Sequence, residues 1–286
     1  MTVLVTGGAG QLGRSVVRRG AARGLSIAAL AHSELDVCDE AAVERQLAAV
    51  APTLVIHAAS YTRVDDAERD AERAFAVNAE GARLVAGACA RHRVPLLHVS
   101  TDFVFAGDGA RPYREDDPVG PLNVYGETKV VSERHVLEAG GTVVRTSWLF
   151  SAHGPSFVQA IVRLALAQTV LRVVDDQRGC PTWADDLADA LLELGGRDDR
   201  AGIYHYCNEG EITRHAFAVA IVDHARRYRS LACERIDPIS SSAFPSAARR
   251  PALSTLDTSR IRGLGIATPP WQRGLDATLA DDLGGG

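Results

Sequence analysis

The feature that most constrains the fold is a glycine pattern directly after the first apolar run. The run TVLVT (2–6) is typical of a buried strand, and VTGGAGQLG (5–13) then places Gly7, Gly10 and Gly13 where a helical pattern begins. Glycines at this spacing permit a tight turn, and they let backbone N–H groups and a helix N-terminus approach a pyrophosphate. The alternative is a plain glycine-rich turn. The position at the head of a strand–helix series favours dinucleotide binding.

Short apolar runs alternate with helical patterns through the first half of the chain. We expect strands at 2–6, 26–30, 53–59, 95–101 and 142–148, and helices at 11–23, 40–50, 68–92 and 124–138. This alternation is typical of βαβ units with right-handed crossovers. The predicted fold class is therefore α/β, a Rossmann-type doubly wound parallel sheet with helices on both faces.

The end of the second strand bears on the choice of dinucleotide. Domains of this type that bind NAD usually carry an acid there, which contacts the ribose hydroxyls. Here the position holds Ala31, His32 and Ser33, while Asp36 follows only in a loop and Arg14 lies beside the glycines. A missing acid leaves room for a 2′-phosphate. The sequence therefore favours NADPH, with NADH as the alternative.

The pattern changes after residue 150. Helices are expected at 156–168, 184–194 and 213–230, a strand at 202–208, and irregular loops from 238 to 270. We predict an NADP(H)-binding domain over 1–150, completed by about 170–200, because strand–helix alternation ends there. Segments 151–169 and 201–286 are predicted to form a smaller, discontinuous substrate-binding lobe.

Composition excludes several classes of protein. The 286 residues are 46% hydrophobic and 23% charged, with a net charge of −5 and no long basic run, which argues against nucleic acid as a partner. The five cysteines are odd in number and widely spaced, so neither a disulfide framework nor a zinc site is indicated. We see no signal peptide and no membrane span, and we expect a soluble, cytoplasmic protein.

Tyr125 and Lys129 lie four residues apart in VYGETK (124–129), so a helix would place them on one face. An exposed contact between the two side chains is one interpretation. The other is a phenol whose pKa, ordinarily near 10, is lowered by the neighbouring ammonium. The PLN turn before the pair, the Ser-Thr-Asp at the end of a strand (100–102) and the N-terminal glycines favour the second interpretation.

Eight stretches of the chain together resemble one family. They are VTGGAGQLG (5–13), VIHAASYTRVDDAE (55–68), VNAEGARLVA (77–86), HVSTDFVFAGDG (98–109), PLNVYGETK (121–129), VVRTSWLFSAHG (143–154), DQRGCPTWADDLAD (176–189) and AARRP (247–251). In this order and spacing they resemble the dTDP-4-dehydrorhamnose reductases, which are extended short-chain dehydrogenase/reductases. The resemblance covers nearly the whole chain.

The resemblance implies a set of site residues. Thr101, Tyr125 and Lys129 match the catalytic triad of the family. The implied cofactor residues are Gly7, Gly10, Gln11, Leu12, Gly13, Asp36, Val37, Ala58, Ala59, Ser60, Tyr61, Thr62, Asn78, Tyr125 and Lys129. The implied substrate residues are Thr101, Asp102, Tyr125, Trp148 and Arg250. With Arg249, Arg250 is either a surface pair or a clamp on a diphosphate. We assign no metal site.

Other positions are weighed differently. Phe103, the run 155–157 and Leu253 depart from the family pattern, and they lie on the predicted substrate side. Three histidines in predicted strands are expected to be core residues rather than catalysts: His57, His98 and His205. Three arginines are expected on a solvated helix face: Arg226, Arg227 and Arg229.

The resemblance implies reduction of the 4-keto group of a dTDP-4-keto-6-deoxyhexose, with dTDP-4-dehydro-β-L-rhamnose as the first candidate and dTDP-L-rhamnose as its product. NADPH would supply hydride, and Tyr125 the proton, with Lys129 lowering the pKa of the phenol. One alternative is the same chemistry on another nucleotide-linked keto-sugar in natural-product glycosylation. Another is a non-catalytic nucleotide-binding regulatory subunit. Monomer and homodimer are both open.

Overall fold

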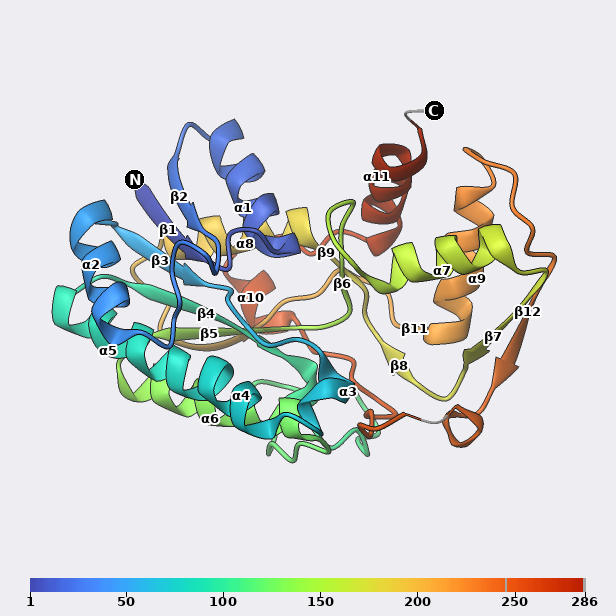
Figure 1. The fold of residues 1–286 in the computed structure, drawn as a ribbon, viewed down its shortest axis with the longest axis horizontal. Coiled ribbons are helices and arrows are strands. Elements are labelled where there is room, and N and C mark those ends of the chain that lie inside the picture. The colour runs from blue at the N-terminus through green and yellow to red at the C-terminus, as the bar shows by residue number, and fades with distance from the viewer. Residues whose placement is uncertain (245, 285–286) are drawn as a thin grey trace.

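The computed structural model describes residues 1–244 and 246–284, and in it the chain forms two parts that lie side by side (Figure 1). A six-stranded sheet with its helices makes up the larger part. A lobe of helices with short strand pairs makes up the smaller part. The carboxyl ends of the sheet strands point toward the lobe.

All six strands of the main sheet are parallel, in the order β10-β5-β4-β3-β1-β2. They are β1 (Thr2–Thr6), β2 (Ser26–Leu30), β3 (Leu54–His57), β4 (Leu96–Thr101), β5 (Thr142–Thr146) and β10 (Gly202–His205). From β1 the chain passes to β2 on one side and then to β3 on the other, so the direction of winding reverses at β1. This confirms the predicted doubly wound sheet.

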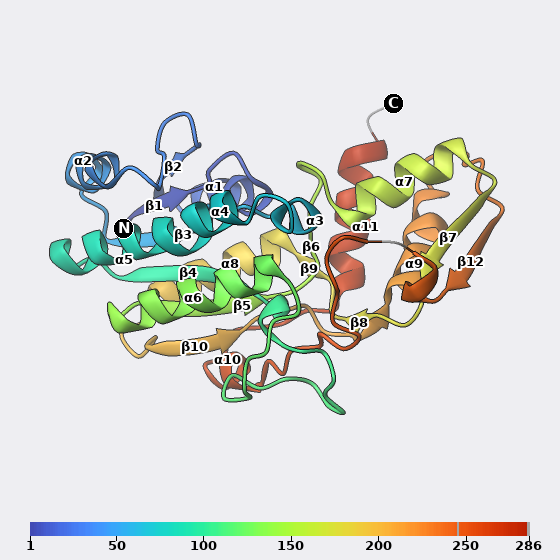
Figure 2. The same cartoon turned by 60° about the horizontal axis from the view of Figure 1, so that its bottom comes forward.

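Helices cover both faces of this sheet (Figure 2). On one face lie α1 (Gln11–Ala22) and α8 (Ala184–Gly195), and on the other α2 (Glu40–Val50), α5 (Gly81–His92) and α6 (Val124–Glu138). Successive strand residues point to opposite faces. Accordingly Val3 and Val5 join the core under α1 and α8, while Leu4 joins the core under α2 and α5.

The helix predicted at 68–92 is confirmed from Ala71 onward, but its middle is π-helical. After a separate short helix, α3 (Val64–Ala67), the segments α4 (Ala71–Phe75), a π-helical turn at Ala76–Glu80 and α5 follow one another without a break. The π-helical turn carries Asn78, whose side chain bonds to a distant loop. Such turns are rare and frequently mark functional sites. Helical periodicity could not reveal it, because a single turn of i→i+5 hydrogen bonds leaves no repeat in the sequence.

The lobe consists of α7 (Phe157–Ala167), α9 (Arg214–Ala225), α11 (Trp271–Leu283) and the parallel pair β7 (Val170–Val174) and β12 (Arg235–Ile239). Phe217 lies at the centre of its aromatic core, with ring centroids 5.9 Å from Phe150 and 5.3 Å from Trp271. Two short pairs, β6 (Leu149–Phe150) with β9 (Thr182–Trp183) and β8 (Arg178–Gly179) with β11 (Ile212–Thr213), join the lobe to the sheet.

One part of the segment 201–286, which we predicted to belong to the lobe, lies with the sheet. Strand β10 extends the sheet beside β5, and α10 (Ser259–Gly263) packs against it. The physical reason is burial, since Tyr204 and Ile261 belong to the core cluster between the sheet, α1 and α8. The remaining domain bounds stay a prediction.

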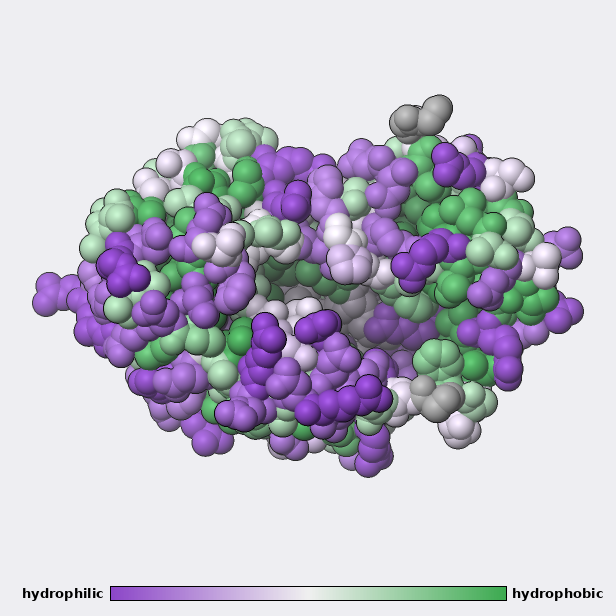
Figure 3. All heavy atoms as spheres, viewed as in Figure 1, coloured by the Kyte–Doolittle hydropathy of each residue, from purple (hydrophilic) through white to green (hydrophobic). Residues whose placement is uncertain are grey.

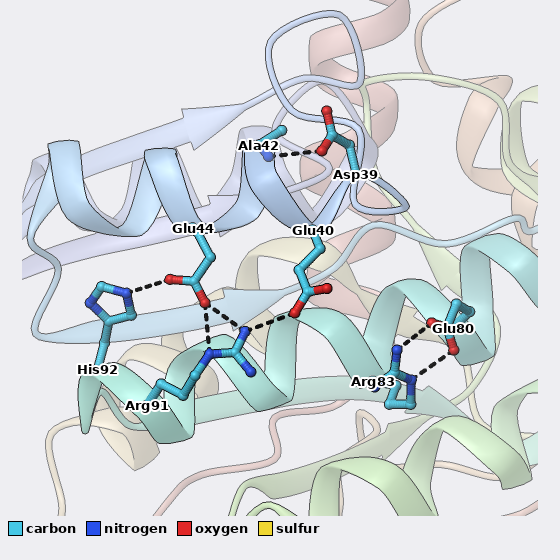
Figure 4. A network of polar contacts seen from close by, with 8 residues as sticks. All are labelled: Asp39, Glu40, Ala42, Glu44, Glu80, Arg83, Arg91 and His92. Carbon is cyan, nitrogen blue, oxygen red and sulfur yellow. Dashed lines mark hydrogen bonds and ion pairs between the residues drawn. The ribbon is translucent and has the colours of Figure 1, made fainter.

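Ion pairs fasten α2 to α5 on the outer surface (Figure 4). Arg91 contacts Glu44 at 2.5 Å and Glu40 at 3.2 Å, and His92 contacts Glu44 at 2.7 Å. Exposed pairs of this kind contribute at most about 1 kcal/mol each. Together they fix α2, which begins shortly after the segment 36–37 that lines the cavity described below.

Several smaller predictions concern burial. All five cysteines are free thiols, and four of them are buried. His57, His98 and His205 are fully buried, as expected of core residues, and Arg226, Arg227 and Arg229 are exposed.

In the described ranges 1–244 and 246–284, no helix combines the length and apolar character needed to span a bilayer.

Candidate active site

A cavity of about 740 Å³ lies between the carboxyl edge of the sheet and the lobe. The hollow is visible near the centre of the face drawn in Figure 3. It opens beside β1 and β3, where the winding of the sheet reverses, and ligands of open α/β sheets bind at such points. The cavity is therefore the candidate site.

The glycine turn after β1 forms one wall of this cavity. Gly7 has a φ of +72°, and a Cβ there would lie 2.8 Å from the backbone nitrogen of Ala59. Gly10 is the N-cap of α1 and supplies no side-chain hydrogen bond, so the first N–H groups of the helix remain uncapped. Those N–H groups and the positive end of the helix suit a diphosphate. The turn therefore fits the dinucleotide that the glycines predict.

Asp36, Val37 and His32 line the far end of the cavity beyond the glycine turn. The Asp36 carboxylate accepts a hydrogen bond from the backbone nitrogen of Cys38 at 2.9 Å, which fixes this turn. Arg14 does not line the cavity, because its Nε donates to the carbonyl of Ala9 at 3.0 Å. The arginine that does line this part of the cavity is Arg73 of α4, which sequence reasoning missed.

Asn78 is the one predicted cofactor residue that does not line the cavity. Its Oδ1 accepts hydrogen bonds from Ser60 Oγ at 2.9 Å and from the Tyr61 nitrogen at 2.6 Å. Its Nδ2 donates to the carbonyl of Tyr61 at 3.1 Å and to Thr128 Oγ1 at 2.9 Å. Asn78 thus ties the loop after β3 to α6. The predicted contact of Asn78 with the cofactor stays a prediction.

Thr101, Tyr125 and Lys129 meet at the same cavity. Thr101 ends β4, and α6 begins just before Tyr125, where the Asn123 side chain accepts a hydrogen bond from the Gly126 nitrogen at 2.8 Å. A side-chain cap of this type fixes where a helix starts. One turn into α6, the ammonium of Lys129 donates to the carbonyl of Val99 at 2.8 Å. It also contacts His98 Nε2 at 3.1 Å.

The electrostatics of this group differ in one respect from the sequence prediction. Burial raises the pKa of Tyr125 to about 12, the charge of Asp102 adds to the rise, and the Thr101 hydroxyl acts against it. Lys129 is not among the groups that shift it. Burial also lowers the pKa of Lys129 to about 8, which Glu133 opposes. The phenol is therefore protonated at neutral pH, as a proton donor must be.

The side of the cavity that we predicted to hold the substrate carries an incompletely bonded carboxylate. Asp102 is 2% exposed, and its Oδ1 accepts a hydrogen bond from Thr101 Oγ1 at 3.0 Å. Its buried Oδ2 has no hydrogen-bond partner of good geometry in the described part of the chain, and the nearby hydroxyl of Ser254 only partly offsets the effect of burial on the carboxyl. Burial raises the pKa of Asp102 to about 6. A buried polar atom of this kind needs a partner, which a ligand hydroxyl can supply.

Trp148 adopts a conformation that is unusual for its residue type. Its φ is +48°, in the left-handed region that non-glycine residues seldom occupy, and such strain is often found at functional sites. The indole lines the cavity and lies against Gly179, where a Cβ would come within 2.6 Å of the ring. The guanidinium of Arg214 lies 3.5 Å from the ring centroid. Sequence reasoning missed Arg214, because a single arginine at the start of a helix carries no motif.

Arg250 lines the cavity, but its guanidinium is already bonded. Its Nη2 lies 2.6 Å from Asp65 Oδ2 and its Nη1 3.1 Å from Asp65 Oδ1. Among the positions that depart from the family pattern, Phe103 lines the cavity with its ring edge-on to Tyr125 at 5.8 Å. Pro155 also lines it, whereas Phe157 and Leu253 do not.

Apart from Asn78, every predicted site residue lines this one cavity. These residues are Gly7, Gly10, Gln11, Leu12, Gly13, Asp36, Val37, Ala58, Ala59, Ser60, Tyr61, Thr62, Thr101, Asp102, Tyr125, Lys129, Trp148 and Arg250. They come from segments spread over most of the chain, and the fold gathers them.

Comparison with known proteins agrees with this geometry. A family model described as the RmlD substrate binding domain matches residues 1–283. The dTDP-4-dehydrorhamnose reductase of Streptomyces griseus is 44% identical over 272 residues, covering 92% of this chain and 88% of that protein. A probable dTDP-4,6-dihydroxy-2-methyloxan-3-one 4-ketoreductase of Streptomyces antibioticus is 41% identical over 289 residues, covering 99% and 96%.

Solved structures include a similar protein of nearly the same length. The dTDP-4-dehydrorhamnose reductase of Bacillus anthracis, solved in complex with NADP, superposes with a TM-score of 0.92 at 32% identity. The superposition covers 98% of this chain and 99% of that one. The chain therefore belongs to the dTDP-4-dehydrorhamnose reductase family of extended short-chain dehydrogenase/reductases.

Proposed function

We propose that this chain uses NADPH to reduce the 4-keto group of a dTDP-4-keto-6-deoxyhexose. The first candidate substrate is dTDP-4-dehydro-β-L-rhamnose, which would give dTDP-L-rhamnose. One observation carries the proposal. Thr101, Tyr125 and Lys129 line the same cavity as the uncapped N-terminus of α1, so a proton donor and a dinucleotide site share one space.

The residues at the sheet edge suit the cofactor. The backbone at Gly10 and Gln11 would hold the diphosphate, and Ser60 and Lys129 would lie beside the ribose and nicotinamide. The absence of an acid at 31–33 and the presence of Arg73 on the cavity wall support NADPH over NADH. The similar protein from Bacillus anthracis was solved with NADP.

The chemistry follows from the protonation states. NADPH, when bound, supplies a hydride to the carbonyl carbon of the sugar. Tyr125, kept protonated by its raised pKa, donates its proton to the carbonyl oxygen as the carbon–oxygen double bond is reduced. Thr101 would orient the same oxygen once its hydroxyl turns from Asp102 to the substrate. Solvent then returns a proton to the phenolate left on Tyr125.

A second candidate is the same reaction on another dTDP-linked keto-sugar. Two observations favour it. One is the similarity to the Streptomyces antibioticus 4-ketoreductase. The other is Phe103 on the cavity wall, which departs from the family pattern and offers the substrate no hydroxyl. A purely regulatory nucleotide-binding subunit is a weaker alternative. Such a protein has no need for Thr101, Tyr125 and Lys129 to share one cavity.

The experiment that tests the proposal is a panel of dTDP-, UDP- and GDP-linked 4-keto-6-deoxyhexoses, assayed for oxidation of NADPH and of NADH. The product C4 configuration is then determined by NMR. We expect turnover with a dTDP-sugar and NADPH. Turnover only with sugars linked to another nucleotide would contradict the proposed dTDP-sugar substrate. No turnover with any of the sugars would contradict the proposal that the protein is a keto-sugar reductase.

A further inference from the structure

The two arginines on the substrate side of the cavity differ in what they contact. The fork of Arg250 is bonded to both carboxylate oxygens of Asp65. Arg214 also lines the cavity, yet within residues 1–244 and 246–284 it makes no salt bridge and no hydrogen bond to another side chain. A partly buried cation that is not hydrogen-bonded to an anion costs free energy unless a ligand pairs with it.

Aromatic rings hold the guanidinium of Arg214 in place. It lies 3.5 Å from the ring centroid of Trp148 and 5.0 Å from that of Phe157. Stacking on aromatic faces leaves the edge of the guanidinium, which carries its N–H donors, free for hydrogen bonds. Arg214 is the first residue of α9, whose N-cap Thr213 accepts a hydrogen bond from the Ala216 nitrogen at 3.1 Å. The backbone that carries the side chain is therefore fixed as well.

The charge of Arg214 persists at neutral pH. Burial lowers the pKa of Arg214 only to about 9, and the nearby carboxylate of Asp102 supports the charged form. The cavity thus presents a fixed cation on its lobe side. The uncapped N-terminus of α1 lies on its sheet side, where the cofactor diphosphate fits. Two separate places for anionic groups therefore face one cavity.

We propose that Arg214, stacked on Trp148, binds the diphosphate of the nucleotide-sugar substrate. This inference rests on the proposed function. A dTDP-sugar carries its negative charge only on its diphosphate, and the guanidinium fork matches phosphate oxygens in a bidentate arrangement. Arg214 is thus a binding residue, and the diphosphate clamp that the sequence analysis considered for Arg250 falls to Arg214 instead, since Asp65 already occupies Arg250.

The test compares dTDP with thymidine, which lacks only the diphosphate, by isothermal titration calorimetry. The proteins are wild type, Arg214→Gln, Arg214→Lys, Arg250→Gln and, as a matched control on the same lobe, Arg235→Gln. Arg235 is exposed and pairs with Asp237 at 2.7 Å. Titration with NADPH shows whether each variant keeps its fold.

We expect Arg214→Gln to weaken dTDP binding about 10- to 100-fold, the range for a hydrogen bond to a charged group. Thymidine and NADPH binding should stay within about 3-fold of wild type, and Arg214→Lys, which keeps the charge without the fork, should fall between. Arg235→Gln should match wild type. If Arg214→Gln does not fold, Arg214→Lys decides the question through the ratio of dTDP to thymidine affinity.

Three results would overturn the inference. In the first, Arg214→Gln leaves the affinity for dTDP unchanged, so that Arg214 serves only as the countercharge of Asp102. Affinities for dTDP and thymidine fall together, which places Arg214 at the nucleoside. Arg250→Gln, and not Arg214→Gln, removes the preference for dTDP. Failure of the proposed function looks different, because wild type would then reduce no nucleotide-linked keto-sugar, whatever Arg214 binds.

Discussion

Asp102 should make the folded protein less stable as the pH rises, and Asp102→Asn should remove that dependence. The carboxyl group is 2% exposed and its Oδ2 has no partner in the described residues. Burial raises its pKa from the ordinary 3.8 to about 6. At 1.36 kcal/mol for each pH unit, this difference amounts to about 3 kcal/mol.

The sign follows from proton linkage. Because the pKa of Asp102 is higher in the folded than in the unfolded chain, folding favours the protonated carboxyl. Below about pH 4, Asp102 does not lower the free energy of unfolding. The loss grows as the pH rises toward about 6, and it reaches its full value above that. An asparagine has no such dependence. Its amide has a constant free energy, which cancels when one variant is compared with itself at different pH.

The assay is urea denaturation, followed by circular dichroism, at intervals from about pH 4 to about pH 8. The free energy of unfolding of Asp102→Asn minus that of wild type should rise by about 3 kcal/mol across this range. Asp117→Asn is a control of opposite character. Arg111 holds the pKa of Asp117 at about 2, so its difference from wild type should be flat over the same range.

A flat difference for Asp102→Asn would refute the reasoning. It would mean that Asp102 is paired or solvated in solution and does not offer a free oxygen to a ligand. A difference that falls with pH would mean that the ionised carboxylate is stabilised in the folded state.

Three further predictions concern the surroundings of the cavity. Arg145→Met leaves Glu133, which is 4% exposed, without the guanidinium that now contacts it at 2.7 Å, and urea denaturation should show a loss of about 3–5 kcal/mol. The value of kcat/KM should fall as the pH rises through about 8, because Lys129 loses its charge there, and a profile that stays level beyond pH 9 would contradict this. Gly179→Ala places a Cβ within 2.6 Å of the Trp148 ring, so steady-state kinetics should show a raised KM for the sugar with NADPH binding unchanged.

Much of the sheet domain could be predicted because its signals are local. Parallel strands buried on both faces are short apolar runs, and the helices between them carry their own periodicity. The π-helical turn at Asn78 could not be predicted, since a single such turn leaves no repeat in the sequence and the Asn78 side chain bonds to Tyr61 and Thr128 elsewhere in the chain. The place of β10 beside β5 is likewise a long-range pairing.

The same distinction applies to the site. The glycines, Tyr125 and Lys129 lie in motifs with fixed spacing, so each of them could be identified as a site residue from the sequence alone. Arg214 has no such spacing, and only the folded chain brings it over Trp148. For Arg250 the sequence allowed a diphosphate clamp, and its partner Asp65 lies 185 residues away. The direction of the Tyr125 pKa shift also depended on burial, which no local pattern gives.

The most direct test of the central claim, that Tyr125 is the proton donor to a ketone, is single-turnover oxidation of NADPH by Tyr125→Phe in the presence of a dTDP-4-keto-sugar. Loss of a positioned general acid costs about 100- to 10,000-fold in rate. We predict a loss in that range for Tyr125→Phe, with NADPH affinity within about 2-fold of wild type, because the phenyl ring keeps its packing against Phe103. A rate equal to that of wild type would contradict the account.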